Sequence, residues 1–244
     1  MIPPRIADIW VYLSASPLLW LTITLIAYQA AYWVYARSGF SPLLNPVPIA
    51  ILGLVAALKA TGTAYPIYFE GAQFVHFLLG PATVALAIPL YAQFDKLRKL
   101  LLPLGGALVA GSVTAIVSVL AIGWALGASD TTLLSLVPKS VTAPIAMGIT
   151  EKLGGLPSLT AVLVILTGIS GAVMAKYVLD ALRIKDFGVR GFAIGIAAHG
   201  IGTARAFQVS EEAGAFAGLG MGLNGLLTAV LVPIVVGLIR NFVG

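Results

Sequence analysis

The residues best suited to chemistry lie in the segment 135–147, where Lys139, Ser140 and Thr142 stand with two prolines inside an otherwise apolar run. Proline has no amide proton and obstructs the preceding helical turn, so a continuous helix here is kinked or broken. In a membrane, interrupted backbone and a lysine ammonium both require protein, water or a bound anion around them. The segment therefore predicts a broken or re-entrant helix that lines a site for a small anion. The alternative is a proline-kinked helix whose lysine extends to the membrane surface.

A second polar group, His199, Thr203 and Arg205, lies in the glycine-rich segment 191–208. His199 and Thr203 are four residues apart and share one face of a helix. Arg205 joins that face only if the helix unwinds near Gly202, which the glycines allow. The group predicts further contacts to an anion and an imidazole that can exchange a proton. The alternatives are a core histidine bonded to a neighbouring helix and an arginine at the membrane surface.

An earlier apolar segment resembles the first one in outline. When Pro81 is aligned with Pro138, Thr83 falls on Ser140, and a long apolar helix follows each copy. Paired interrupted helices are typical of transporters, in which the N-termini of half-helices face an anionic substrate near the middle of the membrane. The pattern predicts an internal repeat with Thr83 in the site. The alternative is that shared membrane composition produces the likeness.

The composition places these groups in a membrane. Hydrophobic residues make up 59% of the 244 residues, charged residues only 9%, and the mean hydropathy is +1.02. A soluble domain of that composition lacks the polar surface to cover itself, so we expect an all-α polytopic membrane protein. The chain has no cysteine, which excludes disulfides and thiolate metal sites, and neither a metal nor another cofactor is predicted. The apolar runs lie at 17–36, 45–60, 72–92, 100–127, 132–150, 157–182, 190–208 and 213–240.

The basic residues predict the topology, because cytoplasmic loops are enriched in lysine and arginine. They gather at Arg37, 96–99, 183–190 and Arg240, in short loops between apolar runs, which favours topology signals over nucleic-acid binding. If all four groups are cytoplasmic, an even number of crossings separates the second from the third. Three apolar runs lie between them, so the run 132–150 is expected not to cross.

These constraints predict about 7–8 transmembrane helices, of which one or two are broken or re-entrant. They place the amino terminus outside and the carboxyl terminus inside. We expect a single transmembrane domain over residues 1–244, with possible repeat halves at 17–127 and 128–244.

Three further polar residues have simpler interpretations. Glu70 follows a tyrosine-rich stretch typical of a membrane interface, and it is a solvated loop acid, a partner for Lys139 or a protonation site. Asn45 precedes a proline-rich helix start and is expected to cap it. Asn224, inside the last apolar run, is expected to join two helices rather than to bind a ligand.

Four stretches together resemble the LrgB/CidB family: 80–91, 138–147, 154–157 and 199–205. The resemblance runs nearly from end to end, from Asn45 onward. It implies a bacterial inner-membrane protein, and such proteins are often paired with a small LrgA/CidA holin-like partner. Members are described as modulators of murein hydrolase export and cell lysis and also as carriers of small carboxylates. The plastid glycolate/glycerate transporter is similar to a fusion of both partners.

Two positions depart from the family pattern. Thr142-Ala143 stands where two threonines are common in the family, and Gly80 stands where other members have a polar residue. Neither departure touches a charged position, so the predicted anion contacts are unchanged. The chain contains no LrgA-like half, so an LrgA/CidA-like partner would be a separate membrane protein. We also expect a homodimer in the lipid bilayer.

The leading hypothesis is a secondary transporter of small monocarboxylates such as glycolate, glycerate or pyruvate. The alternative is a holin/antiholin-like auxiliary protein that modulates murein hydrolase export and cell lysis. A holin acts through large membrane lesions and needs no fixed anion site, so the predicted anion contacts favour the transporter. An enzyme is not expected, because the sequence has no Gly-x-Ser-x-Gly, His-Glu-x-x-His or paired-carboxylate motif. The predicted substrate-binding residues are Lys139, Ser140, Thr142, Arg205, Thr203 and Thr83, and the candidates for proton coupling are His199 and Glu70.

Overall fold

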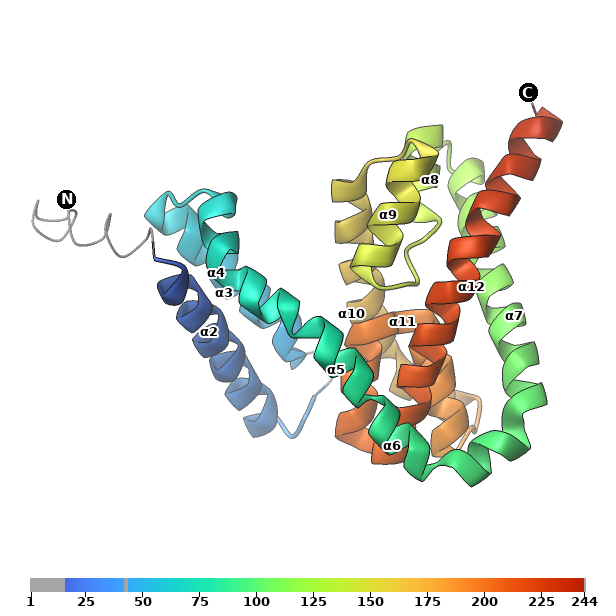
Figure 1. Ribbon diagram of the computed structural model, residues 1–244, viewed down its shortest axis with the longest axis horizontal. Coiled ribbons are helices and arrows are strands. Elements are labelled where there is room, and N and C mark those ends of the chain that lie inside the picture. Colours follow the sequence, from blue (N-terminus) through green and yellow to red (C-terminus); the bar gives the residue numbers. More distant parts are fainter. Residues whose placement is uncertain (1–15, 42–43, 244) are drawn as a thin grey trace, which may run out of the picture. The chain divides into compact units, whose positions relative to one another are not determined.

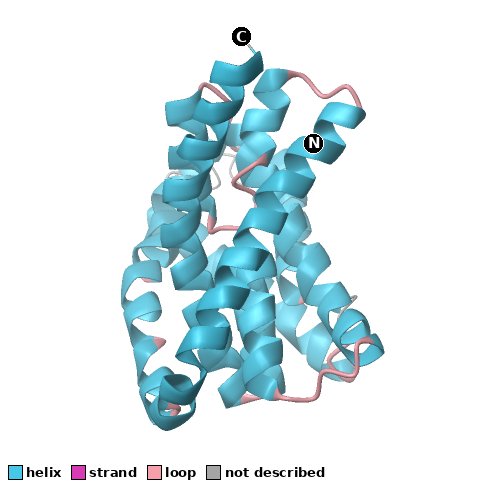
Figure 2. Ribbon diagram, turned by 90° about the vertical axis from the view of Figure 1, so that its right-hand side faces the viewer, coloured by secondary structure: helices cyan, strands magenta, loops and turns pink. Residues whose placement is uncertain are grey.

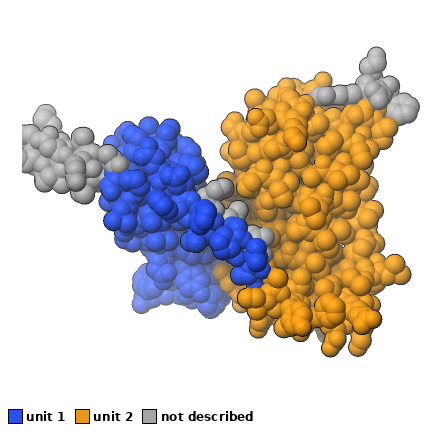
Figure 3. Space-filling view, viewed as in Figure 1, with its two compact units in different colours: residues 1–85 blue, residues 86–244 orange. Residues whose placement is uncertain are grey.

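The computed structural model describes residues 16–41 and 44–243, and each regular element in those ranges is a helix (Figure 1, Figure 2). The predicted all-α class is confirmed. The chain forms two compact units, unit 1 at 1–85 and unit 2 at 86–244 (Figure 3). Their boundary does not coincide with the predicted repeat boundary at 127, and the internal repeat stays a prediction.

Unit 1 contains α2 (Pro17–Arg37), α3 (Pro46–Thr61), α4 (Tyr65–Phe77) and α5 (Leu79–Ala85). Its core forms where α2 packs on α4. The Trp20 ring is fully buried and meets the Tyr68 ring edge to face, with 5.8 Å between the ring centroids. Gly71 allows this approach, because a Cβ there would collide with the α2 backbone. Asn45 caps α3 as predicted, since its Oδ1 accepts a 3.0 Å hydrogen bond from the Val47 amide.

Unit 2 contains the short α6 (Ala87–Ala92) and three long helices, α7 (Phe94–Ala125), α10 (Pro157–Ala181) and α12 (Glu211–Val243). α7 and α12 run in the same direction. Their first turns meet through Lys96 and Glu212, and their later turns share a hydrophobic cluster that contains Val119 and Val236. Pro103 lies inside α7 and Pro233 inside α12, where each removes a main-chain hydrogen bond.

The predicted interrupted run 132–150 forms two half-helices, α8 (Asp130–Leu136) and α9 (Ala143–Leu153). Residues 137–142 connect them through turns, with Lys139 near the tip. The last turn of α8 lies beside the residues that follow α9, because the Ser135 hydroxyl in α8 accepts a 2.8 Å hydrogen bond from the Leu156 amide just beyond α9. The chain therefore enters and leaves this α8–α9 hairpin at the same end of unit 2.

The chain reverses a second time within α11 (Phe187–Val209). The backbone leaves the helical region at His199, with φ 41° and ψ −133°. The arms before and after His199 lie side by side, because Arg190 and Val209 line one cavity. A straight helix would hold those two residues about 28 Å apart. The predicted unwinding near Gly202 therefore occurs three residues earlier, at His199.

Three long helices thus run the length of unit 2, and two helical hairpins enter it from opposite ends. α10 begins beside α8, where the Thr160 hydroxyl donates to the Ser135 carbonyl at 2.8 Å. It ends beside the start of α11, where Arg190 pairs with Asp180 at 2.7 Å. The α8–α9 hairpin and the α11 hairpin therefore approach each other along α10 (Figure 1).

The predicted count of about 7–8 membrane-spanning helices is not confirmed. Within the described residues, five helices are long and apolar enough to cross a membrane: Pro17–Arg37, Tyr65–Ala92, Phe94–Ala125, Pro157–Ala181 and Glu211–Leu238. The run 190–208 was wrongly expected to cross, because it turns back at His199. One crossing fewer puts the Arg240 end of α12 opposite the loops 96–99 and 183–190. Within unit 2, the carboxyl end of α12 therefore does not lie at the same end as the loops 96–99 and 183–190. The side of the membrane on which each terminus lies stays a prediction.

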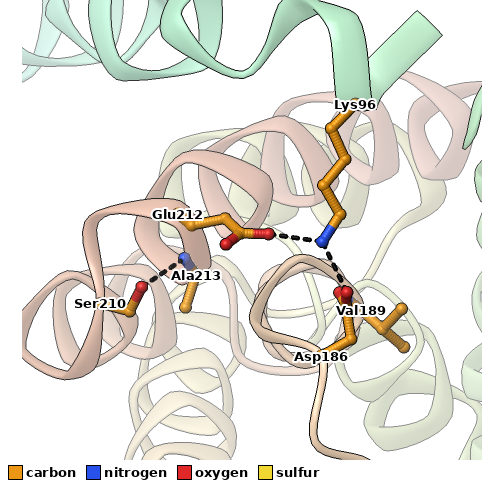
Figure 4. Close-up of polar contacts among 6 residues, drawn as sticks. All are labelled: Lys96, Asp186, Val189, Ser210, Glu212 and Ala213. Atoms are coloured by element: carbon orange, nitrogen blue, oxygen red, sulfur yellow. Dashed lines mark hydrogen bonds and ion pairs between the residues drawn. The ribbon is translucent and has the colours of Figure 1, made fainter. Parts of the chain in front are cut away.

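Lys96 ties the two ends of α11 to α7 (Figure 4). Its Nζ lies 2.6 Å from Asp186 Oδ2, just before α11, and 2.6 Å from Glu212 Oε1, just after it. Asp186 also caps α11 by accepting a 2.9 Å hydrogen bond from the Val189 amide. The hydrogen bond from Lys96, followed by the amide of Val189, lowers the pKa of Asp186 from its ordinary value of 3.8.

We predict that the charge of Asp186 stabilises unit 2 at neutral pH but not in strong acid. Because its pKa is lower in the folded state, the contribution is present above the unfolded pKa and disappears as the pH falls through the folded pKa. Asp186→Asn keeps the capping oxygen and removes the charge. It should cost about 0.5 kcal/mol at pH 7, since the pair is partly exposed, and progressively less as the pH is lowered toward 2. Thermal unfolding of the detergent-solubilised protein measures the cost of the substitution at each pH. An equal cost at the two pH values would contradict the prediction.

Candidate functional site

A single buried carboxamide joins the two interrupted segments. Asn224 in α12 donates from Nδ2 to the carbonyls of Ser140 and Ile196, each at 3.1 Å. Ser140 lies at the tip of the α8–α9 hairpin, and Ile196 lies just before the break in α11. Asn224 Oδ1 accepts the hydroxyls of Ser112 at 2.6 Å and Thr228 at 3.3 Å. The carboxamide therefore replaces the main-chain partners that a continuous helix would supply, and the predicted helix-joining role of Asn224 is confirmed.

The tip of α11 is held against α10. The His199 ring is 3% exposed, and its Nε2 lies 3.0 Å from the Val164 carbonyl. A carbonyl can only accept, so Nε2 carries the proton. The Thr203 hydroxyl donates to the His199 carbonyl at 2.7 Å. Gly168 in α10 provides room for the imidazole, because a Cβ there would lie 2.7 Å from Cε1 of the ring. His199 thus has the contacts of a core histidine, and its proton-coupling role stays a prediction.

A cavity of about 650 Å³ lies between α7, the tip of the α8–α9 hairpin and the first arm of α11; we call it the Lys139 cavity. Its polar side chains are Lys139, Ser140 and Thr114. The rest of its wall is apolar: Leu100, Pro103, Leu104, Ala107, Ala110, Gly111, Ala115, Val189, Phe192, Ala193, Ile196 and Ala197.

Lys139 places a cation in these apolar surroundings. The side chain is half-buried, and its Nζ lies 3.2 Å from Ser140 Oγ. Within residues 16–41 and 44–243, the ion pairs involve other cations, and none joins Lys139 to a carboxylate. An ammonium removed from water without a counterion is costly. An anion that enters the cavity would offset that cost.

Of three other predicted site residues, Thr142 is not part of the lining of this cavity, and Glu70 and Thr83 belong to unit 1. Thr142 is the N-cap residue of α9, and its hydroxyl makes no capping hydrogen bond. Glu70 is exposed on α4 of unit 1, in a helix rather than the expected loop. Thr83 belongs to α5 of unit 1, and its side chain lies outside the described part of the structure. Their roles stay predictions.

Arg205 lines a second cavity, of about 420 Å³, between α10 and the two arms of α11. Arg190 on the first arm lines this cavity, whereas Val189 lines the Lys139 cavity. The first arm of α11 therefore separates the two cavities. One small carboxylate does not contact Lys139 and Arg205 together in this structure, because the reversal at His199 carries Arg205 to the far side of that arm.

Sequence reasoning missed two residues of this region. Thr114 lies among alanine, glycine and serine in a long apolar helix, and nothing in its spacing distinguishes it. Lys96 was assigned only to a basic loop. Its position before the apolar part of α7 gives no sign of Asp186 and Glu212, which lie far along the chain.

Comparisons with known proteins point to one family. The profile of the LrgB-like family matches residues 24–238. The chain is 37% identical to "Uncharacterized protein YxaC" of Bacillus subtilis over 218 residues, which cover 89% of this chain and 94% of that protein. It is 31% identical to "Holin-like protein CidB" of Staphylococcus epidermidis over 225 residues, 92% of this chain and 97% of that protein. It is 30% identical to "Antiholin-like protein LrgB" of Bacillus mycoides over 220 residues, 90% of this chain and 96% of that protein. No solved structure gives a significant match.

We predict that Asn224 stabilises the meeting of the two hairpins more than any single hydroxyl around it. Asn224→Leu removes four hydrogen bonds at once and leaves two buried carbonyls without this donor, so it should cost roughly 3 kcal/mol of unfolding free energy. Thr228→Val is the matched control in the same helix, and its loss of one hydroxyl should cost about 1 kcal/mol. Thermal unfolding in detergent compares them. Similar midpoints for the two variants would contradict the prediction.

Proposed function

The chain belongs to the LrgB-like family, and from this premise we propose that it is a secondary transporter of small monocarboxylates. The family and the five apolar helices make it a multi-pass membrane protein. One observation carries the proposal: the Lys139 ammonium lies in a largely apolar cavity without a carboxylate partner among the described residues. A transporter of an anion needs such a charge, whereas a holin-like protein that forms a large membrane lesion does not.

The lining of the Lys139 cavity favours a short acid with few polar groups. Lys139 supplies one positive charge, and the hydroxyls of Ser140 and Thr114 can bond a 2-hydroxyl or 2-oxo group. The remaining wall is apolar and offers little to a polyanion or a sugar. Glycolate, glycerate and pyruvate fit this description, and the cavity has room for hydrating water beside them. Arg205 is not part of this proposed site, because it lines the other cavity.

The two hairpins offer a way to release the anion. The substrate would touch the tip of the α8–α9 hairpin through Lys139 and the first arm of α11 through Ile196 and Ala197. A small displacement of either hairpin would open the cavity toward one end of unit 2. Both hairpins would act as re-entrant membrane segments. Proton coupling through the imidazole of His199 is part of this proposal, because the ring lies at the turn of the α11 hairpin.

A second candidate function is supported by the names of the relatives. "Holin-like protein CidB" and "Antiholin-like protein LrgB" cover nearly the whole chain. These names favour an auxiliary role in murein hydrolase export and cell lysis more directly than they favour carboxylate transport. In either role we propose a bacterial inner-membrane location, a homodimer, and a separate LrgA/CidA-like membrane partner.

We predict that uptake of a small carboxylate depends on the charge at position 139. Full-length protein in liposomes should accumulate labelled glycolate, glycerate or pyruvate. Lys139→Gln should reduce uptake at least about tenfold, because losing one ion pair in an apolar site costs upward of 1.4 kcal/mol. Lys139→Arg should retain part of the activity. Lys152→Gln is the matched control, an exposed lysine on α9 of the same hairpin, and it should leave uptake unchanged.

The holin-like role gives the opposite result in the same vesicles. It predicts release of a trapped dye much larger than a carboxylate, with no effect of Lys139→Gln. Dye release of that kind, together with uptake of all three acids no faster than in empty vesicles, would reject the carboxylate transporter.

A further inference from the structure

We propose that the cavity lined by Arg205 binds the phosphate headgroup of an anionic phospholipid. This cavity is separate from the Lys139 cavity and does not depend on the transport function. It lies between the last turns of α10, the two arms of α11 and the start of α12. We call it the basic cavity, after the four basic side chains that line it: Lys176, Lys185, Arg190 and Arg205.

The reversal of α11 brings these basic side chains close together. Arg190 lies on the first arm of the hairpin and Arg205 on the second, so an extended helix would separate them by about 22 Å. Lys176 comes from α10 and Lys185 from the loop that joins α10 to α11. Four basic side chains from three segments thus surround one volume of about 420 Å³.

The cations outnumber the acids in this cavity. Asp180 is the one acidic side chain of its lining, and it already bonds Arg190 at 2.7 Å. Arg190 also donates to the Ile184 carbonyl at 2.9 Å, so it is fixed in place. Arg205 donates to Gln208 Oε1 at 3.3 Å, a hydrogen bond within the second arm of α11. A tetrahedral anion with several acceptor oxygens matches such a cluster better than a planar carboxylate does.

The apolar part of the cavity selects a lipid over a free anion. Between the basic side chains its wall is made of small or apolar residues, among them Ala172, Ile194 and Val209. Free phosphate gains nothing from such a wall, whereas the glycerol and first acyl carbons of a phospholipid do. Lys176 lies near the end of a helix long enough to cross the membrane, where headgroups are expected. Basic cavities between membrane helices at a membrane surface commonly hold acidic lipid headgroups.

The test measures lipid-dependent stabilisation of the full-length protein. Thermal unfolding is followed in nanodiscs of phosphatidylcholine alone and of phosphatidylcholine with about 20% phosphatidylglycerol. A third arm adds inorganic phosphate to the phosphatidylcholine discs. We expect phosphatidylglycerol to raise the midpoint by about 4 °C, because a bound ligand stabilises the state that binds it, and phosphate to have no effect.

The variant Lys176→Gln/Arg205→Gln should lose most of the phosphatidylglycerol shift. Arg98→Gln/Lys99→Gln is the charge-matched control, because both residues are exposed at the end of unit 2 that carries the 183–190 loop and line neither cavity. It should keep the shift. Lys176→Arg/Arg205→Lys preserves the charges and should also keep it, which separates binding from misfolding.

Three results would overturn the proposal. An equal shift with inorganic phosphate would assign the cavity to a free anion. An equal loss of the shift in the Arg98→Gln/Lys99→Gln control would show diffuse surface attraction rather than a site. Full retention of the shift in the Lys176→Gln/Arg205→Gln variant would place lipid binding elsewhere. None of these results changes carboxylate uptake through Lys139, so they are distinct from a failure of the proposed function.

Discussion

The arrangement of unit 2 depends on four hydrogen bonds made by one side chain, Asn224. Interrupting a helix in an apolar interior leaves main-chain carbonyls without their amide partners, and an unpartnered carbonyl there is costly. Both hairpins carry such a carbonyl near their tips, at Ser140 and Ile196, and one carboxamide serves both. The hydroxyls of Ser112 and Thr228 hold its oxygen in turn. The tips of the two hairpins therefore meet beside Asn224 in α12.

Close packing allows α11 to fold back beside α12. Gly191 and Gly195 are one turn apart, and a Cβ on either would collide with the carbonyl of Ala213 or Ala217. Small residues at this spacing let membrane helices approach closely without a hydrophobic driving force. The reversal at His199 then places the two faces of the first arm against different neighbours. One face lines the Lys139 cavity with α7, and the other lines the basic cavity with α10.

The two cavities differ in the kind of anion that their charges suit. The Lys139 cavity is mostly apolar and has one cation beside two hydroxyls, which suits a small acid that binds and leaves. The basic cavity has four cations and one acid, which suits the phosphate group of the proposed lipid. The holin-like and antiholin-like names of the relatives describe neither property.

The sequence alone determined the membrane class, the all-α fold, the family, and the interruption around Lys139, because composition, proline and a charged residue in an apolar run act locally. It also indicated the roles of Asn45, which precedes a helix start that needs a capping group, and of Asn224, which lies inside an apolar helix and must find a nearby partner. The sequence did not predict the reversal of α11, where the chain turns back without a proline. The run 190–208 has the length and hydropathy of a span, and its reversal depends on packing of His199 against Gly168 and on glycine contacts with α12. Only the tertiary structure could place Arg205 away from Lys139, because that separation follows from a turn held by contacts between residues distant in the chain.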